Sequence, residues 1–239
     1  ATNAGGIQVI HYGMTRDWVT GLKVVTGTGE LLELNQGLIK NNTGLDFRHL
    51  FIGSEGILGV IVEATLALTD PPTNPRVMVL GVQSMPAIMQ VLAKCQARLS
   101  VLAFEFFSDL ALEKVTAAHS VQPPFQARFP YYALVEFESI STAAETQALE
   151  LVEACMAAGW VEDAVLSQNE SQRRSLWRLR EDISETIAQW TPYKNDISTT
   201  VEQAPELLSS VDALVAQQYA DLEVVWYGHI GDGNLHLNI

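Results

Sequence analysis

The sequence predicts an α+β protein built from two parts, and three observations support this class. Residues 1–70 are rich in glycine and in residues that favour β-strands. From about residue 76 onward, segments with strand and helix patterns alternate. Between the two parts runs Asp70-Pro71-Pro72-Thr73-Asn74-Pro75, and proline lacks the amide donor that regular structure needs. We therefore expect one domain at 1–72 and a second at 73–239.

The first part is expected to contain a β-hairpin and one further strand. Leu22–Thr26 and Glu30–Leu34 flank Gly27-Thr28-Gly29, and a three-residue loop with glycine is a common hairpin connection. Apolar residues then recur at every second position from Val60 to Leu68. This alternation predicts a strand that is strongly buried on one face.

The second part is expected to alternate strands and helices. The predicted strands are Val77–Val82, Leu102–Phe107, Tyr131–Glu138 and Leu222–Ile230. The predicted helices are Pro86–Arg98, Leu110–Ala118, Thr142–Ala158, Glu170–Gln189 and Pro205–Tyr219. Alternation with some tight β-connections is typical of a sandwich of ferredoxin-like α+β units.

Composition excludes several classes of protein. The formal net charge is −14 and no stripe of Lys and Arg occurs, which argues against nucleic-acid binding. No run of 18 uninterrupted apolar residues is present, which argues against a membrane-spanning helix. Two cysteines, Cys95 and Cys155, are too few for a disulfide scaffold, so we expect both to be buried and reduced, in the cytoplasm.

The C-terminal segment carries the most informative pattern. His229 and His236 lie seven residues apart, with the turn-forming sequence Gly231-Asp232-Gly233-Asn234 between them. If the chain reverses there, Ile230 pairs with Leu235 and His229 with His236, which brings two imidazoles to one face about 5 Å apart at Cβ. Such a pair suits a shared divalent metal, and Asn238 lies on the same face. The alternative is a hairpin with two half-exposed histidines.

A second pattern lies in the predicted helix 170–189. Arg180 and Ser184 are four residues apart and so are neighbours on one helical face. An arginine there can grip a carboxylate with two hydrogen bonds. Lys194 follows in an extended stretch. The alternative is a solvent-exposed charge cluster on the helix, with Lys194 also at the surface.

Two glycine-rich loops in the first part form a third pattern. Thr2-Asn3-Ala4-Gly5-Gly6 and Gly53–Ile61 each lie beside strand-like sequence. Loops of this kind let backbone amides approach a phosphate or a flat ring. Neither matches a P-loop or a dinucleotide fingerprint, and ordinary tight turns remain the alternative.

Taken together, these segments resemble the FAD-linked oxidase and dehydrogenase superfamily that includes vanillyl-alcohol oxidase. Within it they are most similar to the 2-hydroxyacid dehydrogenases acting on D-2-hydroxyglutarate, D-lactate or glycolate. The matching segments are ATNAGG at 1–6, YG at 12–13, KNNTGLDFRHLFIGSEGILGVI at 40–61, LWRLRE at 176–181, KNDIS at 194–198 and GHIGDGNLHLN at 228–238. The match runs along the whole chain. It implies the C-terminal half of a vanillyl-alcohol-oxidase-type FAD domain, followed by a ferredoxin-like substrate (cap) domain.

The resemblance also implies a role for each pattern. Residues expected to contact FAD are Thr2, Asn3, Ala4, Gly5, Glu55, Gly56, Ile57, Leu58, Gly59, Val60 and Ile61. His229 and His236 are expected to bind a divalent metal, typically zinc, with manganese or iron in some relatives. Residues expected to contact substrate are Arg180, Ser184, Lys194 and Asn238, and catalysis is expected to depend on Arg180, Lys194, His229 and His236.

The implied activity is oxidation of a 2-hydroxy acid, with D-2-hydroxyglutarate favoured, to the 2-oxo acid by metal-assisted hydride transfer to flavin. Alternatives are D-lactate or glycolate as substrate, another chemistry of the same superfamily, a flavin-free metal-binding module, or a domain used only for association. Expected partners are a small 2-hydroxy acid and an electron-transfer protein or quinone, with a homodimer as a further option.

Some parts of the family pattern are absent or altered. The chain is expected to be an internal fragment, inactive and flavin-free alone. The family's metal-binding glutamate and the neighbouring histidine thought to act as base would follow residue 239, and its pyrophosphate-binding loop would precede Ala1. Asn195 stands where relatives often have an aromatic residue, and Thr199-Thr200 where they have Val-Pro, which puts the shape of the substrate pocket in question.

Overall fold

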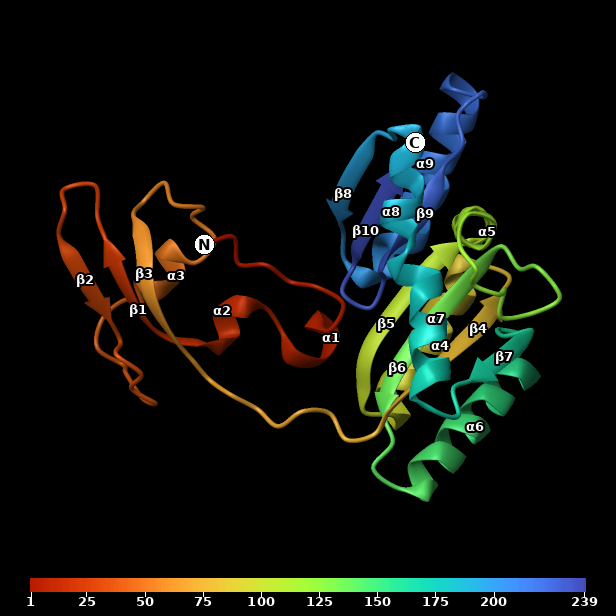
Figure 1. Cartoon of the computed structure of the whole chain (residues 1–239), viewed down its shortest axis with the longest axis horizontal. Coiled ribbons are helices and arrows are strands. Elements are labelled where there is room, and N and C mark those ends of the chain that lie inside the picture. Colours follow the sequence, from red (N-terminus) through yellow and green to blue (C-terminus); the bar gives the residue numbers. More distant parts are fainter. The chain divides into compact units, whose positions relative to one another are not determined.

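The computed structural model describes residues 1–239 as two compact units, Ala1–Pro71 and Pro72–Ile239 (Figure 1). The division falls within the proline-rich stretch, one residue before the predicted boundary. None of the helices combines the length and apolar character needed to cross a membrane.

The first unit is a small antiparallel sheet with three one-turn helices. Its strands are β1 (Val19–Val25), β2 (Leu31–Leu34) and β3 (Val60–Leu66), in the order β2-β1-β3. The helices are α1 (Val9–Tyr12), α2 (Thr15–Trp18) and α3 (Arg48–Phe51). Leu22 pairs with Leu34 across the first two strands, so the predicted hairpin is confirmed.

The predicted burial of the third strand is wrong. Val60, Val62 and Leu66 are all more than half exposed, and Leu68 is 92% exposed. The core of this unit consists of Val19, Leu22, Val24, Phe51 and Ile52. From the third strand, only Ile61 packs against that core. The alternation assigned the buried face wrongly, because the face that carries Val60, Val62 and Leu66 is the exposed one and Ile61 lies on the opposite face. Three strands without a second layer cover only one face of the sheet.

The second unit contains a seven-stranded antiparallel sheet in the order β7-β4-β6-β5-β9-β10-β8. Its strands are β4 (Pro75–Val82), β5 (Val101–Ser108), β6 (Tyr131–Glu138), β7 (Asp163–Leu166), β8 (Lys194–Ser198), β9 (Val225–His229) and β10 (Asn234–Asn238). Its α-helices are α4 (Met85–Arg98), α5 (Asp109–Ala118), α6 (Thr142–Ala157), α7 (Glu170–Glu181), α8 (Ile183–Ile187) and α9 (Ala204–Gln218). Two short 3-10 turns, η1 (Ala188–Trp190) and η2 (Val201–Gln203), complete it.

One half of this sheet is a ferredoxin-like unit, as predicted. Its strands β4, β5, β6 and β7 are the first to fourth strands of a βαββαβ motif. They lie side by side in the order β7-β4-β6-β5, the 4-1-3-2 order of a ferredoxin-like sheet. Helix α5 is inserted between β5 and β6. Strands β9, β10 and β8 continue the same sheet beyond β5.

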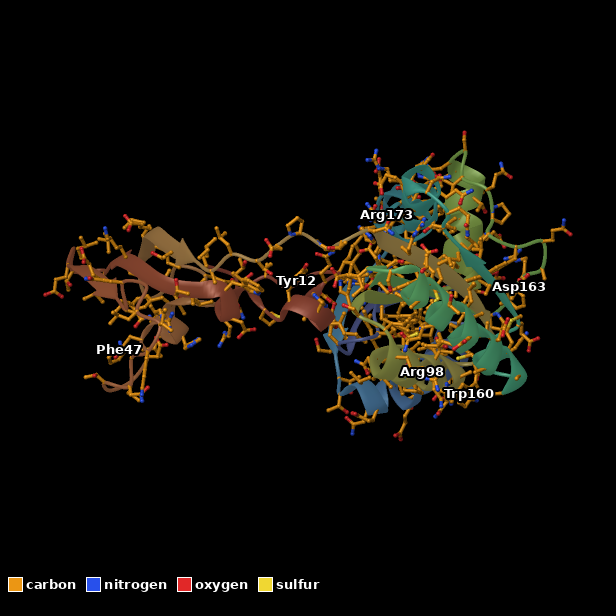
Figure 2. All side chains as sticks on the ribbon, turned by 90° about the horizontal axis from the view of Figure 1, so that it is seen from below. Tyr12, Phe47, Arg98, Trp160, Asp163 and Arg173 are labelled. Carbon is orange, nitrogen blue, oxygen red and sulfur yellow. The ribbon has the colours of Figure 1, made fainter.

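Helices cover the ferredoxin-like half of the sheet, and side chains fill the interior of this unit (Figure 2). Helix α4 packs against α6 and on strands β4 and β5, whereas α7 packs on the same strands and against α5. Every residue of β5 is buried, which is expected of a strand covered on both sides. Side-chain oxygens of Ser84, Ser108, Ser141 and Asn169 cap the helices α4, α5, α6 and α7.

Three predictions of secondary structure need correction. The strand β7 was not predicted, and β8 was predicted only as an extended stretch around Lys194. Each has only four or five residues and depends on pairing with a strand distant in sequence. The predicted helix 170–189 is interrupted at Asp182, where the Thr186 hydroxyl donates to the Asp182 carbonyl at 2.6 Å. Such back-bonding from threonine bends helices. The last predicted strand, 222–230, is shorter, at Val225–His229.

Candidate active site

The β9–β10 hairpin carries both predicted metal-binding histidines. Its turn spans Ile230 to Gly233, with the Asp232 side chain accepting a hydrogen bond from the Asn234 amide at 3.0 Å. Gly233 has a φ of +81°, and a Cβ there would lie 2.1 Å from the Thr199 carbonyl oxygen. Only glycine can occupy this position.

The register of the hairpin differs from the prediction. His229 pairs with Asn234 and Tyr227 pairs with His236, instead of His229 with His236. The shift arises because Ile230 leaves the strand and is fully buried in the turn, while the Gly231 amide bonds the Phe104 carbonyl of β5 at 3.3 Å. The predicted Ile230–Leu235 pair is therefore absent.

The two histidines nevertheless converge. In the observed register they are diagonal neighbours on one face of the hairpin, a position from which long or aromatic side chains still meet. Their ring centroids are 5.2 Å apart, with the planes at 80°. His236 also lies against Tyr227, with ring centroids 4.8 Å apart.

Each imidazole has a carboxylate at its Nδ1 atom. His229 Nδ1 lies 2.7 Å from Glu105 Oε1, and His236 Nδ1 lies 3.4 Å from Asp196 Oδ1. This leaves the Nε2 atom of each ring as the one available to bind a metal. A carboxylate behind the far nitrogen is the usual arrangement around metal-binding histidines.

These residues fit a metal as two of its ligands. No third His, Cys, Asp or Glu joins them to form a group able to hold an ion. Catalytic zinc usually has three protein ligands and one open position, so the pair supplies part of such a set.

Arg180 and Glu105 form a buried ion pair behind the histidines. Glu105 is fully buried and Arg180 is 6% exposed, with Arg180 Nη2 2.8 Å from Glu105 Oε2. The guanidinium carbon also lies 4.6 Å from the centre of the Tyr227 ring, a cation–π contact. Burial raises the pKa of Glu105, and the hydrogen bond from His229 and the charge of Arg180 act in the opposite direction.

The buried side-chain atoms that lack a hydrogen bond all belong to this region. They are Glu105 Oε2, Arg180 Nε and Asn238 Nδ2. Glu105 Oε2 still has its ion pair with Arg180 Nη2 at 2.8 Å, so only Arg180 Nε and Asn238 Nδ2 are without any partner. Leaving a buried polar atom unpaired costs about 1–3 kcal/mol, so native proteins keep few of them and often use them in binding or catalysis. Arg180 Nε and Asn238 Nδ2 are donors, which suits an acidic ligand.

The remaining predicted substrate residues lie on neighbouring elements. Lys194 on β8 is the cross-strand partner of Asn238 on β10, and its Nζ reaches the Ser184 carbonyl of α8 at 3.5 Å. Both Lys194 and Ser184 are exposed. The Lys194 ammonium therefore remains available to a ligand, whereas most of Arg180 is engaged within the protein.

Glu105 and Asp196 were missed by sequence reasoning. A signal for Glu105 was present, because it is the only charged residue in the apolar run Val101–Phe107, and a buried charge requires a partner. Asp196 gave no such signal. It is exposed, and it reaches the site only because β8 pairs with β10, where the side-chain Nδ2 of Asn234 donates to it at 2.8 Å.

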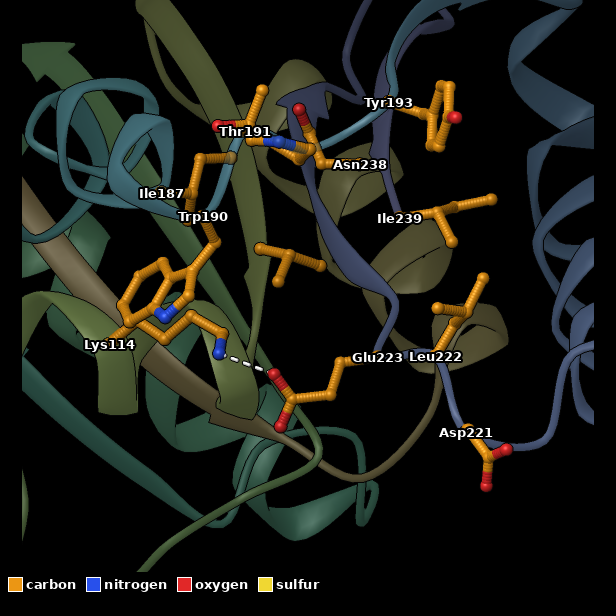
Figure 3. Close-up of a pocket in the computed structure, with 12 residues that line it drawn as sticks. Lys114, Ile187, Trp190, Thr191, Tyr193, Asp221, Leu222, Glu223, Asn238 and Ile239 are labelled. Atoms are coloured by element: carbon orange, nitrogen blue, oxygen red, sulfur yellow. Dashed lines mark hydrogen bonds and ion pairs between the residues drawn. The ribbon is translucent and has the colours of Figure 1, made fainter.

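A pocket of about 420 Å³ borders this region (Figure 3). Asn238 and Tyr193 line one side of it, and Lys114, Trp190 and Glu223 line another. Lys114 pairs with Glu223 at 2.5 Å and lies 4.4 Å from the centre of the Trp190 ring. Its charge is thus already compensated, and among the predicted site residues only Asn238 reaches this pocket.

His236 is expected to make stability depend on pH. Burial, together with the charges of Arg180 and His229, lowers the pKa of His236 from 6.5 to about 4. Between these two values the unfolded chain binds a proton that the folded chain does not, so stability falls as pH decreases from 6.5 to 4. The upper limit of the loss is about 3–4 kcal/mol, and solvent screening at the partly exposed His236 side chain makes the expected loss smaller. The free energy of unfolding of the metal-free chain, measured in denaturant, should show this decrease for the wild type. The decrease should be absent in His236→Gln. The same pH dependence in both proteins would contradict the role of His236.

In the first unit, the two predicted FAD-contacting loops meet. The Ala1 carbonyl accepts hydrogen bonds from the amides of Gly53 and Glu55, at 2.9 and 3.1 Å. Asn3 is held by the Arg16 amide at 2.9 Å, and both Asn3 and Glu55 have positive φ. Positive φ in non-glycine residues often marks functional loops, because the surrounding structure must stabilise it. Residues Thr2–Gly5 thus lie beside the start of the segment Glu55–Ile61.

Protein-family models match segments in both structural units of the chain. Residues 71–239 match the C-terminal domain of FAD linked oxidases, and residues 1–35 match an FAD binding domain family. The chain is 58% identical over its whole length to a D-2-hydroxyglutarate dehydrogenase from Stutzerimonas stutzeri, and 56% identical to one from Xanthomonas citri. It is 35% identical to the mitochondrial D-2-hydroxyglutarate dehydrogenase of Bos taurus. It covers 51%, 50% and 44% of these proteins, so it spans about half the length of the curated relatives it matches.

Solved structures share the fold at low sequence identity. An alkyldihydroxyacetonephosphate synthase matches all of the chain with a TM-score of 0.67 at 15% identity, over 47% of its own length. A 4-ethylphenol oxidase from Gulosibacter chungangensis matches 95% of the chain with a TM-score of 0.62 at 12% identity, over 52% of its own length. The predicted α+β fold of vanillyl-alcohol-oxidase type is confirmed. The chain therefore belongs to the FAD-linked oxidase family, with residues 71–239 as its C-terminal domain.

Proposed function

We propose that this chain is part of an FAD-dependent dehydrogenase that oxidises D-2-hydroxyglutarate to the 2-oxo acid. Relatives named D-2-hydroxyglutarate dehydrogenase, matched along the whole chain, support this substrate. The observation that carries the proposal is the convergence of two carboxylate-backed imidazoles beside two unpaired buried donors, Arg180 Nε and Asn238 Nδ2.

The hydroxy-acid end of the substrate lies at the histidine pair in this proposal. His229 and His236 hold a divalent cation through their Nε2 atoms. When bound, that cation supplies a Lewis acid that lowers the pKa of the substrate hydroxyl, and FAD supplies the hydride acceptor. The low pKa of His236, about 4, keeps its imidazole neutral and able to act as a ligand at neutral pH. Asn238 Nδ2 and Arg180 Nε donate hydrogen bonds to substrate oxygens.

Lys194 binds the distal carboxylate of the diacid. Its ammonium has only a long contact to the Ser184 carbonyl, at 3.5 Å, whereas Arg180 is already paired with Glu105 at 2.8 Å. Lys194 also neighbours Asn238 across the two strands. A diacid therefore gains an ion pair here that D-lactate, with one carboxylate, does not.

In the first unit, the paired loops provide part of the FAD site. Residues 1–35 match an FAD binding domain family, which argues against a flavin-free module. Backbone amides in the segments 2–5 and 55–61 approach the cofactor in this proposal, because residues with positive φ turn successive amides to one side.

The experiment that tests this function is dye reduction by the full-length protein containing this chain. With wild type, D-2-hydroxyglutarate should reduce the dye faster than D-lactate, and a chelator should abolish both activities. Lys194→Ala should lower kcat/KM for the diacid about 10- to 100-fold, the value of one charge-assisted contact, with little change for lactate. Lys94→Ala, at an exposed site on α4, is the matched control. An equal loss for both substrates would contradict the role of Lys194, and lactate preferred by wild type would contradict the proposed substrate.

A further inference from the structure

Glu105 occupies an unusual position for a charged residue. It lies in the middle of β5, where all eight residues are buried, and it is itself 0% exposed. An ionised carboxylate at such a site is costly unless it is paired and hydrogen-bonded. Nothing in the local sequence supplies a partner, since its neighbours on the strand, Phe104 and Phe106, are apolar.

The partners come from two other elements, and both are predicted site residues. One carboxylate oxygen meets His229 Nδ1 of β9 at 2.7 Å, and the other lies 2.8 Å from Arg180 Nη2 of α7. Glu105 thus connects a proposed metal ligand to a proposed substrate-binding residue.

This arrangement determines where the proton of His229 resides. The guanidinium of Arg180 keeps its charge in proteins, so a carboxylate beside it supplies the compensating negative charge. An ionised carboxylate only accepts hydrogen bonds. The His229 Nδ1 atom therefore carries a proton that it donates to Glu105, and the lone pair lies on Nε2.

We propose that Glu105 is a positioning residue that holds His229 in its Nδ1-protonated tautomer and fixes the guanidinium of Arg180. The consequence of this inference rests on the proposed function: with Nδ1 bonded to Glu105, the lone pair of His229 lies on Nε2, where it is free to bind a cation together with the neighbouring His236. The ion pair uses Arg180 Nη2, and Arg180 Nε has no hydrogen-bond partner within the chain, so it remains a free donor.

A second buried carboxylate shows what a purely structural role looks like. Glu136 lies on the adjacent strand β6 and is 3% exposed. It accepts hydrogen bonds from Arg173 and from Trp177 Nε1, the latter at 3.0 Å. Neither partner is a predicted site residue, and both bonds go to the same carboxylate oxygen, Oε1. Glu136 is therefore the matched control for the loss of one buried negative charge.

The direct test measures the histidine tautomer in the metal-free, full 239-residue chain. The chain has five histidines, so labelling histidine with ¹³C and ¹⁵N gives a spectrum that can be assigned by substitution. In wild type, the side-chain shifts of His229 should report protonated Nδ1. In Glu105→Gln the amide can donate to Nδ1 or accept from it, so a mixture of tautomers is expected. Glu136→Gln should leave the His229 signals unchanged.

Zinc affinity in the full-length protein, measured by competition with a chromophoric chelator, provides the second reading. Glu105→Gln should weaken zinc binding about 10- to 100-fold, as loss of a carboxylate behind a histidine ligand does. Glu105→Asp, which keeps the charge at a shorter reach, should lose less, and it serves as the second variant if the glutamine form does not fold. Glu136→Gln should bind zinc as wild type does.

The outcomes separate the two proposals. A wild-type His229 protonated at Nε2, or a tautomer unchanged in Glu105→Gln, overturns the positioning role. A tautomer that responds to Glu105→Gln supports that role, and if wild type then binds no zinc, the proposed metal function fails by itself. Equal zinc affinities in wild type and Glu105→Gln would also overturn the inference.

Discussion

Replacing His229 or His236 with alanine is expected to abolish metal binding and nearly all turnover in the full-length protein. The two imidazoles are the metal ligands in our proposal, and their ring centroids lie 5.2 Å apart. A bound metal contributes several kcal/mol to transition-state stabilisation, so kcat/KM should fall roughly 10³-fold or more. Metal content by mass spectrometry and dye reduction by D-2-hydroxyglutarate check this prediction.

His49→Ala is the control for this experiment. His49 is exposed on α3, and its Nε2 atom lies 3.5 Å from an Asp46 carboxylate oxygen. Its removal should leave metal content and turnover unchanged. If both active-site variants keep their metal and their activity, the two-histidine site is wrong.

Arg180→Met is expected to destabilise the second unit by about 3 kcal/mol, the cost of leaving a buried charge without its partner. Glu105 is fully buried and pairs with Arg180 at 2.8 Å, and methionine keeps much of the arginine volume. Equilibrium unfolding of the chain in urea measures the change. The double variant Arg180→Met with Glu105→Gln should recover a large part of the loss, because the uncompensated charge is then absent.

Arg178→Met separates this effect from a general loss of arginine on the same helix. Arg178 pairs with Asp182 at 2.9 Å, but its side chain is 47% exposed. Exposed ion pairs contribute about 0–1 kcal/mol, so this variant should be near wild type. If both substitutions lowered the free energy of unfolding equally, the prediction that breaking the buried Arg180–Glu105 pair is more destabilising would be contradicted.

Local patterns in the sequence predicted much of the fold. Helix patterns in the sequence predicted the helices at 86–98, 110–118, 142–158 and 205–219 within a few residues. Turn chemistry at Gly231–Asn234 predicted the hairpin that carries both histidines. The predicted register was wrong, because it is set by the burial of Ile230 and by the hydrogen bond from Gly231 to β5. Both are tertiary contacts that the local sequence does not show.

The parts of the site that sequence did not predict depend on long-range pairing. Asp196 reaches His236 only through the β8–β10 ladder, and β8 has no strong strand pattern of its own. Glu105 meets Arg180 and His229 across distances of 75 and 124 positions in the chain. Sequence could show that Glu105 needed a partner, but the identity of that partner depends on how β5, β9 and α7 pack.

Anomalous diffraction at the metal absorption edge, from crystals of the full-length protein grown with zinc, tests the central claim most directly. The account predicts one strong peak within bonding distance of the Nε2 atoms of His229 and His236, with Glu105 still at His229 Nδ1. A peak bound elsewhere, or imidazoles that face a bound substrate with no metal between them, would contradict it.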